Sequence, residues 1–399
     1  MTFAQRTSTL KPDEIREMIK ITSQPGFINF AGGLPAAELF PGKELIEASR
    51  IAIEKYGPTA LQYHSTDGYI PLREKIKARM AKIGVDVPID EILITSGSQQ
   101  GISLGGEVFI DEHVSGDRDI VLTESPTYSG CFNALKTYLP EFIGIPTDDE
   151  GIIPEGLEAE LKKYGSRVKL MYVIPDYQNP SGRAWSTERR KAFIKLIAKY
   201  QVPVLEDAPY RELSFRGEPN KPLKAIDESG MVIHLGSFSK VLAPGFRIAY
   251  IIAKKDILNK FTWASQGAFL QSSTAGEVII DQYLEHNDLD AHVEIIRKTY
   301  KERAELAVKM MESEFPDNVQ FCRPDGGMFT WVTLPEGCNS RDLLKLALDT
   351  KVAFVVGDNF FPKADVFNCF RINFASMKPE LIEEGMKRLG KAIKDYLKK

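Results

Sequence analysis

The chain has 399 residues, which is long for a single hydrophobic core and favours a large domain with a smaller companion. Its 43% hydrophobic and 27% charged residues are typical of an ordinary globular protein, so a largely disordered chain is excluded. With 51 basic and 55 acidic residues the formal net charge is -4, which gives no electrostatic argument for a nucleic-acid or membrane partner. We therefore expect small-molecule ligands.

The N-terminal residues lack the apolar stretch of a secretory signal, and no apolar run approaches the ~20 residues of a membrane-spanning helix. We expect a cytoplasmic protein. The four cysteines are widely separated and the five histidines show no spacing typical of metal ligands. Neither a disulfide framework nor a metal site is expected.

In chain order, the first expected element is a short helix over 12–20, followed by a glycine-containing loop at 30–35. From residue 91, short β-rich apolar runs alternate with longer helical stretches. This alternation predicts an α/β fold with a mostly parallel sheet and helices on both faces. The expected strands are 91–95, 119–123, 169–174, 202–205 and 231–235.

The pattern changes after residue 290. A long helical stretch over 291–315 leads into shorter apolar runs at 326–335, 352–356 and 369–374, and the chain closes with a helix. This mixture predicts a smaller α+β domain. We expect three regions: an N-terminal arm with part of the small domain (1–45), a large α/β domain (46–290) and the small domain (291–399).

Polar residues follow each expected strand of the α/β series. In an open α/β sheet, ligands bind beyond the carboxyl ends of the strands, where the loops and the following helix N-termini face one crevice. The five polar segments are 96–101, 124–128, 175–182, 206–210 and 236–240. The pattern predicts one pocket built from five strand ends.

Two residues in these segments have an ordinary structural interpretation beside the functional one. Ser98 opens a helix, where its hydroxyl and the backbone N–H groups would hold a phosphate, but serine is also a common helix cap. The presence of Ser237 and Arg247 favours the interpretation of Ser98 as part of an anion site. Asp207 follows an apolar run and needs a cationic partner to stay ionised, although a helix cap or a salt bridge would also explain it.

The stretch Ser237-Phe-Ser-Lys240 is compatible with two chemistries. A serine nucleophile of the S-x-x-K type would also require S-x-N and K-T-G elements, and the chain contains neither. Ser103 matches G-x-S-x-G but lies in a helical stretch, which excludes a strand-to-helix elbow. A reacting lysine requires a carbonyl cofactor, which needs a site for its phosphate and a carboxylate for its pyridine nitrogen. Residues for the phosphate site and the carboxylate both accompany Lys240.

With these motifs the sequence resembles the fold-type I pyridoxal 5'-phosphate enzymes, and within them the class I aminotransferases of the 2-aminoadipate and kynurenine aminotransferase group. The resemblance covers nearly the whole chain and implies an aspartate aminotransferase-like fold. It depends on motifs in this order: Phe30–Pro35, Leu61–Tyr63, Ser96–Gln100, Gln178–Gly182, Glu206–Tyr210, Ser237–Arg247 and Phe370–Arg371.

The resemblance implies roles around the cofactor ring for five residues. Lys240 would form the Schiff base, and Asp207 would pair with the pyridinium nitrogen. Asn179 and Tyr210 would bind the phenolic oxygen. Tyr128 would stack on the ring.

The resemblance also implies a phosphate site and a substrate site. The phosphate would be held by Ser98, Gln99, Ser237 and Arg247, with Tyr63 reaching it from the other subunit of a homodimer. Arg371 would bind the substrate α-carboxylate, together with Asn179 and Gly33. Arg16 aligns with an arginine that relatives use near the substrate side chain, or it is one more exposed charge on a helix.

The run from Cys369 to Phe374 alternates in a way that bears on Arg371. Phe370, Ile372 and Phe374 fall on one face, and Arg371 with Asn373 on the other, so the guanidinium need not be buried in the core. A solvated strand face is the alternative.

The implied activity is transfer of an amino group from an L-amino acid of the 2-aminoadipate, aromatic or branched-chain type to a 2-oxo acid such as 2-oxoglutarate, by a ping-pong mechanism. The freed Lys240 would act as general base at the substrate Cα. A β-lyase, a decarboxylase and a non-catalytic amino-acid-sensing domain are the alternatives. Relatives of the sensing kind carry a DNA-binding helix-turn-helix module, for which the segment before Phe30 is too short.

Overall fold

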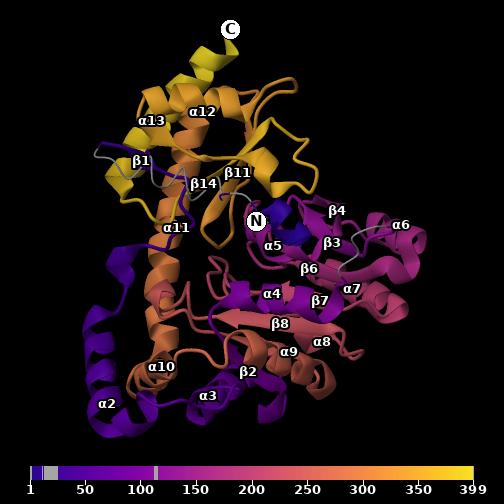
Figure 1. The fold of residues 1–399 in the computed structure, drawn as a ribbon. Helices are drawn as coiled ribbons and strands as arrows, with labels where there is room; N and C mark the ends of the chain where they lie inside the picture. Colours follow the sequence, from indigo (N-terminus) through magenta and orange to yellow (C-terminus); the bar gives the residue numbers. More distant parts are fainter. Residues whose placement is uncertain (1, 11, 13–25, 112–115, 399) are drawn as a thin grey trace.

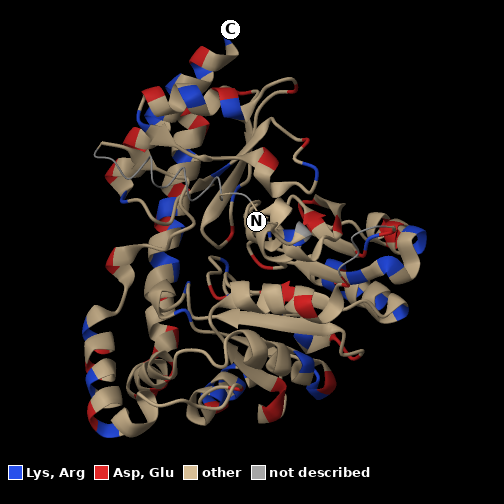
Figure 2. Ribbon diagram, in the orientation of Figure 1, with Lys and Arg blue, Asp and Glu red and all other residues tan. Residues whose placement is uncertain are grey.

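The computed structural model describes residues 2–10, 12, 26–111 and 116–398. The chain forms two parts that the long helix α11 (Leu289–Glu314) joins (Figure 1). Basic and acidic residues are interspersed over both parts (Figure 2). Within the described residues, no helix combines the length and the apolar character that crossing a membrane requires.

The larger part contains an eight-stranded sheet in the spatial order β2-β9-β8-β7-β6-β3-β4-β5. Neighbours from β8 to β4 run parallel, whereas β9 runs antiparallel to both β2 and β8, and β5 runs antiparallel to β4. The strands are β2 (Ile92–Thr95), β3 (Ile120–Ser125), β4 (Glu141–Asp148), β5 (Gly151–Ile152), β6 (Val168–Val173), β7 (Val204–Asp207), β8 (Val232–Ser237) and β9 (Ala249–Ile252).

The five expected strands correspond to β2, β3, β6, β7 and β8, but β4, β5 and β9 are absent from the expected set. Strand β4 lies near one edge, is mostly exposed or half-buried, and contains Gly144 and Pro146, which are poor strand formers. Strand β9 returns antiparallel beside β8 without an intervening long helix, so a βα pattern does not reveal it.

Both faces of the large sheet are covered, so its central strands are continuous apolar runs. On β6, Leu170 and Tyr172 belong to one hydrophobic cluster, and Met171 and Val173 belong to the other. The first cluster is covered by α3 (Ile70–Ala81), α4 (Ser98–Phe109), α5 (Ser129–Leu135), α9 (Lys255–Ala268) and α10 (Thr274–His286). The second is covered by α6 (Pro154–Tyr164), α7 (Thr187–Tyr200) and α8 (Leu223–Ile226).

The smaller part contains a four-stranded antiparallel sheet in the order β10-β11-β14-β13. Its strands are β10 (Gln320–Phe321), β11 (Phe329–Thr333), β13 (Val355–Val356) and β14 (Cys369–Asn373), and its helices are α12 (Ser340–Asp349) and α13 (Pro379–Leu397). The N-terminal strand β1 (Ile28–Asn29) pairs with β12 (Val352–Ala353), which attaches the beginning of the chain to this part. Helix α2 (Gly42–Ala60) runs along one side of the larger part, next to α10 (Figure 1). The exact domain boundaries stay a prediction.

Candidate active site

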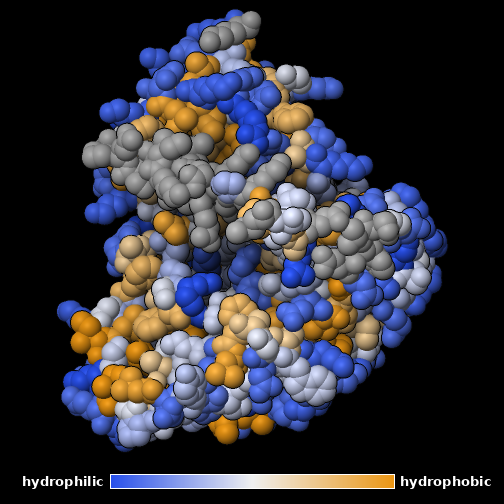
Figure 3. Space-filling model, viewed as in Figure 1, coloured by the Kyte–Doolittle hydropathy of each residue, from blue (hydrophilic) through white to orange (hydrophobic). Residues whose placement is uncertain are grey.

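A cavity of about 790 Å³ lies where the carboxyl ends of the central strands face the smaller part of the chain. Figure 3 shows the surface hollowed between the two parts. The five polar segments that follow β2, β3, β6, β7 and β8 all reach this cavity. Of the residues predicted for the site, the lining contains Gly33, Ser98, Gln99, Tyr128, Asn179, Asp207, Tyr210, Ser237, Lys240, Arg247 and Arg371.

Helix α4 begins at the cavity, and its first turn is a candidate anion cradle. Its N-cap is Gly97, and Ser98 is the first helical residue, so the Ser98 hydroxyl is not the cap. Gly97 has a φ of 89°, and a Cβ at this position would lie 2.1 Å from Nη2 of Arg247. The glycine therefore allows the guanidinium to approach the first turn, where free N–H groups and the helix dipole already favour an anion. The hydroxyls of Ser237 and Ser239, 2.9 Å apart, line the same cavity.

Lys240 follows β8 and is the nucleophile candidate. Its Nζ donates a hydrogen bond of 2.9 Å to the backbone oxygen of Gly33. Burial, reinforced by the positive charges of Arg371 and Arg247, lowers the pKa of Lys240 to about 8, and Asp207 opposes this shift. At neutral pH roughly a tenth of the amine is therefore neutral and nucleophilic, far more than for a lysine of ordinary pKa.

Asp207 ends β7 with only 3% of its surface exposed. Its Oδ2 accepts a hydrogen bond of 2.7 Å from the hydroxyl of Tyr172, whereas Oδ1 has no partner among the described residues. Burial raises the pKa of Asp207 to about 6, although the bond from Tyr172 and the charges of His234 and Lys240 favour the ionised form. A buried carboxylate oxygen without a partner, on a residue that lines a cavity, is suited to a positively charged donor on a ligand.

Arg371, on β14, is enclosed although it lies on the polar face of its strand. The side chain is 2% exposed, so the alternative of a solvated strand face is wrong. Its Nη1 donates to Oδ1 of Asn179 (2.7 Å), its Nη2 donates to the oxygen of Ala31 (2.6 Å), and its guanidinium carbon lies 4.4 Å from the ring centre of Phe329. Burial lowers its pKa to about 10, so it remains a cation at neutral pH and offers carboxylate binding at the cavity wall.

Two tyrosines complete the cavity wall. Tyr210 is buried and packs edge-on against Phe329. Burial raises its pKa well above the ordinary value, so its hydroxyl stays protonated and available as a donor. The hydroxyl of Tyr128 donates to Oε1 of Gln99 (3.3 Å), and Nε2 of Gln99 donates to the oxygen of Gly130, which links this tyrosine to the anion cradle.

These groups match the functional groups of pyridoxal 5'-phosphate. The cradle at α4 suits its phosphate, the Asp207 oxygen without a partner among the described residues suits a protonated ring nitrogen, and the amine of Lys240, with its lowered pKa, suits its carbonyl carbon. Among the described residues, no group of His, Cys, Asp and Glu side chains forms a metal site.

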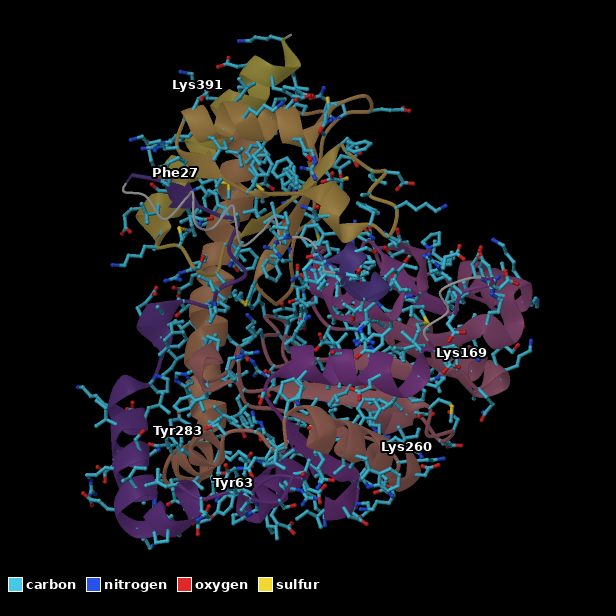
Figure 4. The ribbon with its side chains drawn as sticks, viewed as in Figure 1. Phe27, Tyr63, Lys169, Lys260, Tyr283 and Lys391 are labelled. Carbon is cyan, nitrogen blue, oxygen red and sulfur yellow. The ribbon has the colours of Figure 1, made fainter. Side chains whose placement is uncertain are left out.

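Two predicted site residues do not line the cavity. Tyr63 is 77% exposed and lies at the lower edge of the molecule, away from the junction between its two parts (Figure 4). In a single chain it therefore does not contribute to this site. Arg16, and the helix expected over 12–20 apart from Pro12, lie outside the described residues.

Several residues of the site were not predicted. Leu10, Asn133 and Lys136 also line the cavity, and Tyr172 reaches it through Asp207. In the sequence, Tyr172 is one member of an apolar strand, which gives no sign of a polar contact. Gly97 precedes the helix that starts at Ser98, and a glycine before a phosphate-binding helix was the signal that could have identified it.

Comparisons with known proteins agree with this geometry. The family described as aminotransferase class I and II matches residues 27–389. The chain is 43% identical to aromatic-amino-acid aminotransferase 1 of Thermococcus litoralis (100% of this chain, 95% of the relative) and 38% identical to 2-aminoadipate transaminase of Thermus thermophilus (99% and 97%). Its fold is similar to the crystal structure of Pyrococcus horikoshii kynurenine aminotransferase in complex with PMP, with a TM-score of 0.94, 39% identity and coverage of 100% and 98%.

The family match spans most of the chain, and these relatives are aligned over nearly its full length. The chain therefore belongs to the class I and II aminotransferases, as a pyridoxal 5'-phosphate-dependent enzyme of the group that contains the aromatic, 2-aminoadipate and kynurenine aminotransferases.

Proposed function

We propose that the described cavity is the catalytic site of this aminotransferase and that its residues hold pyridoxal 5'-phosphate by three anchors. Lys240 bonds the carbonyl carbon, and Asp207 pairs with the ring nitrogen. The phosphate is held by Ser98, Gln99, Ser237 and Arg247. The observation that carries the proposal is Oδ1 of Asp207, a buried acceptor without a partner among the described residues, on a residue that lines the same cavity as Lys240 with its lowered pKa.

Bound pyridoxal 5'-phosphate supplies an electron sink for the bond broken at the substrate Cα. Once the substrate amine has taken its place on the cofactor, Lys240, with its lowered pKa, would take the proton from Cα and return it, as general base and acid. Asp207 stays ionised and holds a proton on the ring nitrogen. Asn179 and Tyr210 would bind the phenolic oxygen, and Tyr128 would stack on the ring.

Arg371 binds the α-carboxylate of the substrate. Its Nη1 and Nη2 are oriented by Asn179 and by the oxygen of Ala31, which leaves Nε as a buried donor without a partner among the described residues. A fixed, enclosed guanidinium binds a carboxylate more strongly than a solvated one, because fewer side-chain rotamers are lost on binding. The segment that contains Gly33 lies beside it, held through hydrogen bonds from Asn373 to the oxygens of Gly32 and Leu34.

The proposed amino donors are L-amino acids of the aromatic and 2-aminoadipate types, with branched-chain amino acids as further candidates, and the acceptor is a 2-oxo acid such as 2-oxoglutarate. The names of the aligned relatives support this choice. A ping-pong cycle follows, because one cavity serves donor and acceptor in turn. The role of Arg16 in recognition of the side chain stays a prediction, as does the cytoplasmic location.

The proposed active form is a homodimer in which Tyr63 reaches the phosphate site of the partner. Large apolar side chains are exposed on α2 and in nearby segments, and in Figure 3 hydrophobic residues gather over the corner where Figure 1 shows α2. The exposed residues are Ile46, Ile53, Leu61, Tyr63, Ile70, Trp263, Phe269 and Leu270. Burying such a patch favours association. Sedimentation of the enzyme at micromolar concentration tests this, and an active monomer would contradict it.

The catalytic proposal is tested by spectroscopy and product analysis. Purified protein should carry a yellow chromophore that amino donors bleach and that 2-oxoglutarate restores. Lys240→Ala should lose turnover, and a turning-over Lys240→Ala protein would refute the assignment. Products that form without 2-oxoglutarate would instead support a β-lyase or a decarboxylase.

A further inference from the structure

Tyr172 and Asp207 meet on one face of the central sheet. Strand β6, which contains Tyr172, lies between β3 and β7, and Tyr172 is in register with Leu205 of β7. Residues in register on parallel strands share a face, and so does the residue two positions further along, which is Asp207. The Tyr172 hydroxyl reaches Oδ2 of Asp207 at 2.7 Å, and Tyr172 is fully buried.

Tyr172 does not line the cavity, so any influence on a bound ligand passes through Asp207. The hydrogen bond makes the two oxygens of the Asp207 carboxylate inequivalent. Oδ2 is occupied by the tyrosine, and Oδ1 is left as the acceptor without a partner among the described residues. Because the contact is between two buried groups, it restricts rotation of the carboxylate and selects which oxygen is left as an acceptor without a partner.

We propose that Tyr172 is a positioning residue that orients Asp207 and keeps it ionised, so that the carboxylate holds the proton on the ring nitrogen of pyridoxal 5'-phosphate. The inference depends on the role proposed above for Asp207 and names the residue that makes this role possible.

The charges around Asp207 support this role. Burial raises the pKa of Asp207 to about 6, and the hydrogen bond from Tyr172 is the largest influence that lowers it again. His234 on β8 and Lys240 after β8 also favour the ionised form of Asp207. The buried thiol of Cys131 on α5 interacts electrostatically with both Asp207 and Tyr172. Nδ1 of His234 is engaged with Glu206 at 2.9 Å, so it is not a direct partner of Asp207. Burial also raises the pKa of Tyr172 well above its ordinary value, which keeps the phenol a donor.

The test variant is Tyr172→Phe, which removes the hydroxyl and keeps the ring in the core. The main readout is the ¹⁵N chemical shift of the ring nitrogen in enzyme reconstituted with ¹⁵N-labelled pyridoxal 5'-phosphate, followed against pH. Hydrogen bonds to charged groups are strong enough to move a proton affinity by about tenfold. We expect the ring nitrogen to lose its proton about one pH unit lower than in the parent, with kcat reduced about tenfold and KM for the amino donor changed less than about twofold.

The matched control is Tyr200→Phe on α7. It also removes a phenol that donates to a carboxylate, Oε1 of Glu158 at 3.1 Å, but this pair lies outside the cavity lining. We expect Tyr200→Phe to leave the ¹⁵N titration and the kinetics at parent values. If Tyr172→Phe does not fold, Tyr172→Leu is the second variant and should give the same displaced titration.

The reference variant Asp207→Asn separates the two proposals. It should abolish protonation of the ring nitrogen near neutral pH. If Asp207→Asn does so while Tyr172→Phe titrates like the parent, the inference on Tyr172 is overturned and the role of Asp207 stands. If Asp207→Asn also titrates like the parent, the proposed role of Asp207 fails.

Discussion

The lowered pKa of Lys240 predicts that this buried amine, the proposed catalytic group, destabilises the cofactor-free protein, and that Lys240→Met relieves this cost. Burial and two neighbouring guanidinium groups lower the lysine pKa from its ordinary 10.5 to about 8. The folded chain then binds fewer protons than the unfolded chain between these pH values, so stability rises as pH increases through this range. Below pH 8 the folded lysine is charged and the cost is complete. At 1.36 kcal/mol per pKa unit its upper value is about 3 kcal/mol.

The assay is urea unfolding of the apoenzyme at a fixed protein concentration, at pH 7 and pH 9.5. Methionine fills a volume similar to that of lysine without the charge, so Lys240→Met should raise the free energy of unfolding by up to about 3 kcal/mol at pH 7. At pH 9.5 the gain should fall to about 1.4 kcal/mol, because the unfolded lysine is then closer to losing its own proton.

The control for this experiment is Lys195→Met, which removes an exposed lysine of α7 and should change stability by less than about 0.5 kcal/mol at either pH. A Lys240→Met apoenzyme that is no more stable than the parent at pH 7 would refute the reasoning. An equal gain at both pH values would also refute it, because the effect would then be unrelated to titration of the amine.

Three further predictions concern the cradle, the substrate site and the loop that carries Asn179. Gly97→Ala should weaken cofactor binding by about tenfold or more in a fluorescence titration, because its Cβ would lie 2.1 Å from Nη2 of Arg247 and φ there is 89°. Arg371→Lys should raise KM for amino donors about tenfold and leave the absorbance of the resting enzyme unchanged, since a lysine cannot reproduce the planar fork. Arg190→Met should lower the free energy of unfolding in urea by about 3–5 kcal/mol, because Asp176, whose carboxylate lies 2.6 Å from the guanidinium, stays buried without this partner. Adding Asp176→Leu should recover most of this loss.

The predicted site residues came from strand ends, and this is why most of them meet in the structure. Parallel strands deliver their carboxyl ends to one edge of a sheet, so the order of motifs along the chain already implies that Ser98, Asp207 and Lys240 are neighbours. The same reasoning does not reach Leu10, Asn133 and Lys136, which line the cavity without any motif. It also does not explain Tyr63, whose exposed side chain can belong to a site only if a second chain is present.

Arg371 shows where reasoning from a pattern stops. The alternation of β14 assigns Arg371 to the face opposite Phe370, but alternation does not show whether that face is exposed to solvent. In the fold it is covered by the 31–34 segment, Asn179 and two aromatic rings, so a polar strand face becomes an enclosed binding wall. All four covering groups come from outside β14.

By itself, the sequence determined the α/β series, the cofactor and the candidate for the reacting lysine, because strand periodicity and short motifs are local properties of the chain. Only the tertiary structure decided that β9 returns antiparallel, that Tyr172 occupies one oxygen of Asp207 and that the other oxygen has no partner among the described residues. These features depend on which strands lie side by side and on which atoms burial leaves without water. Neither is encoded in the spacing of residues along one segment.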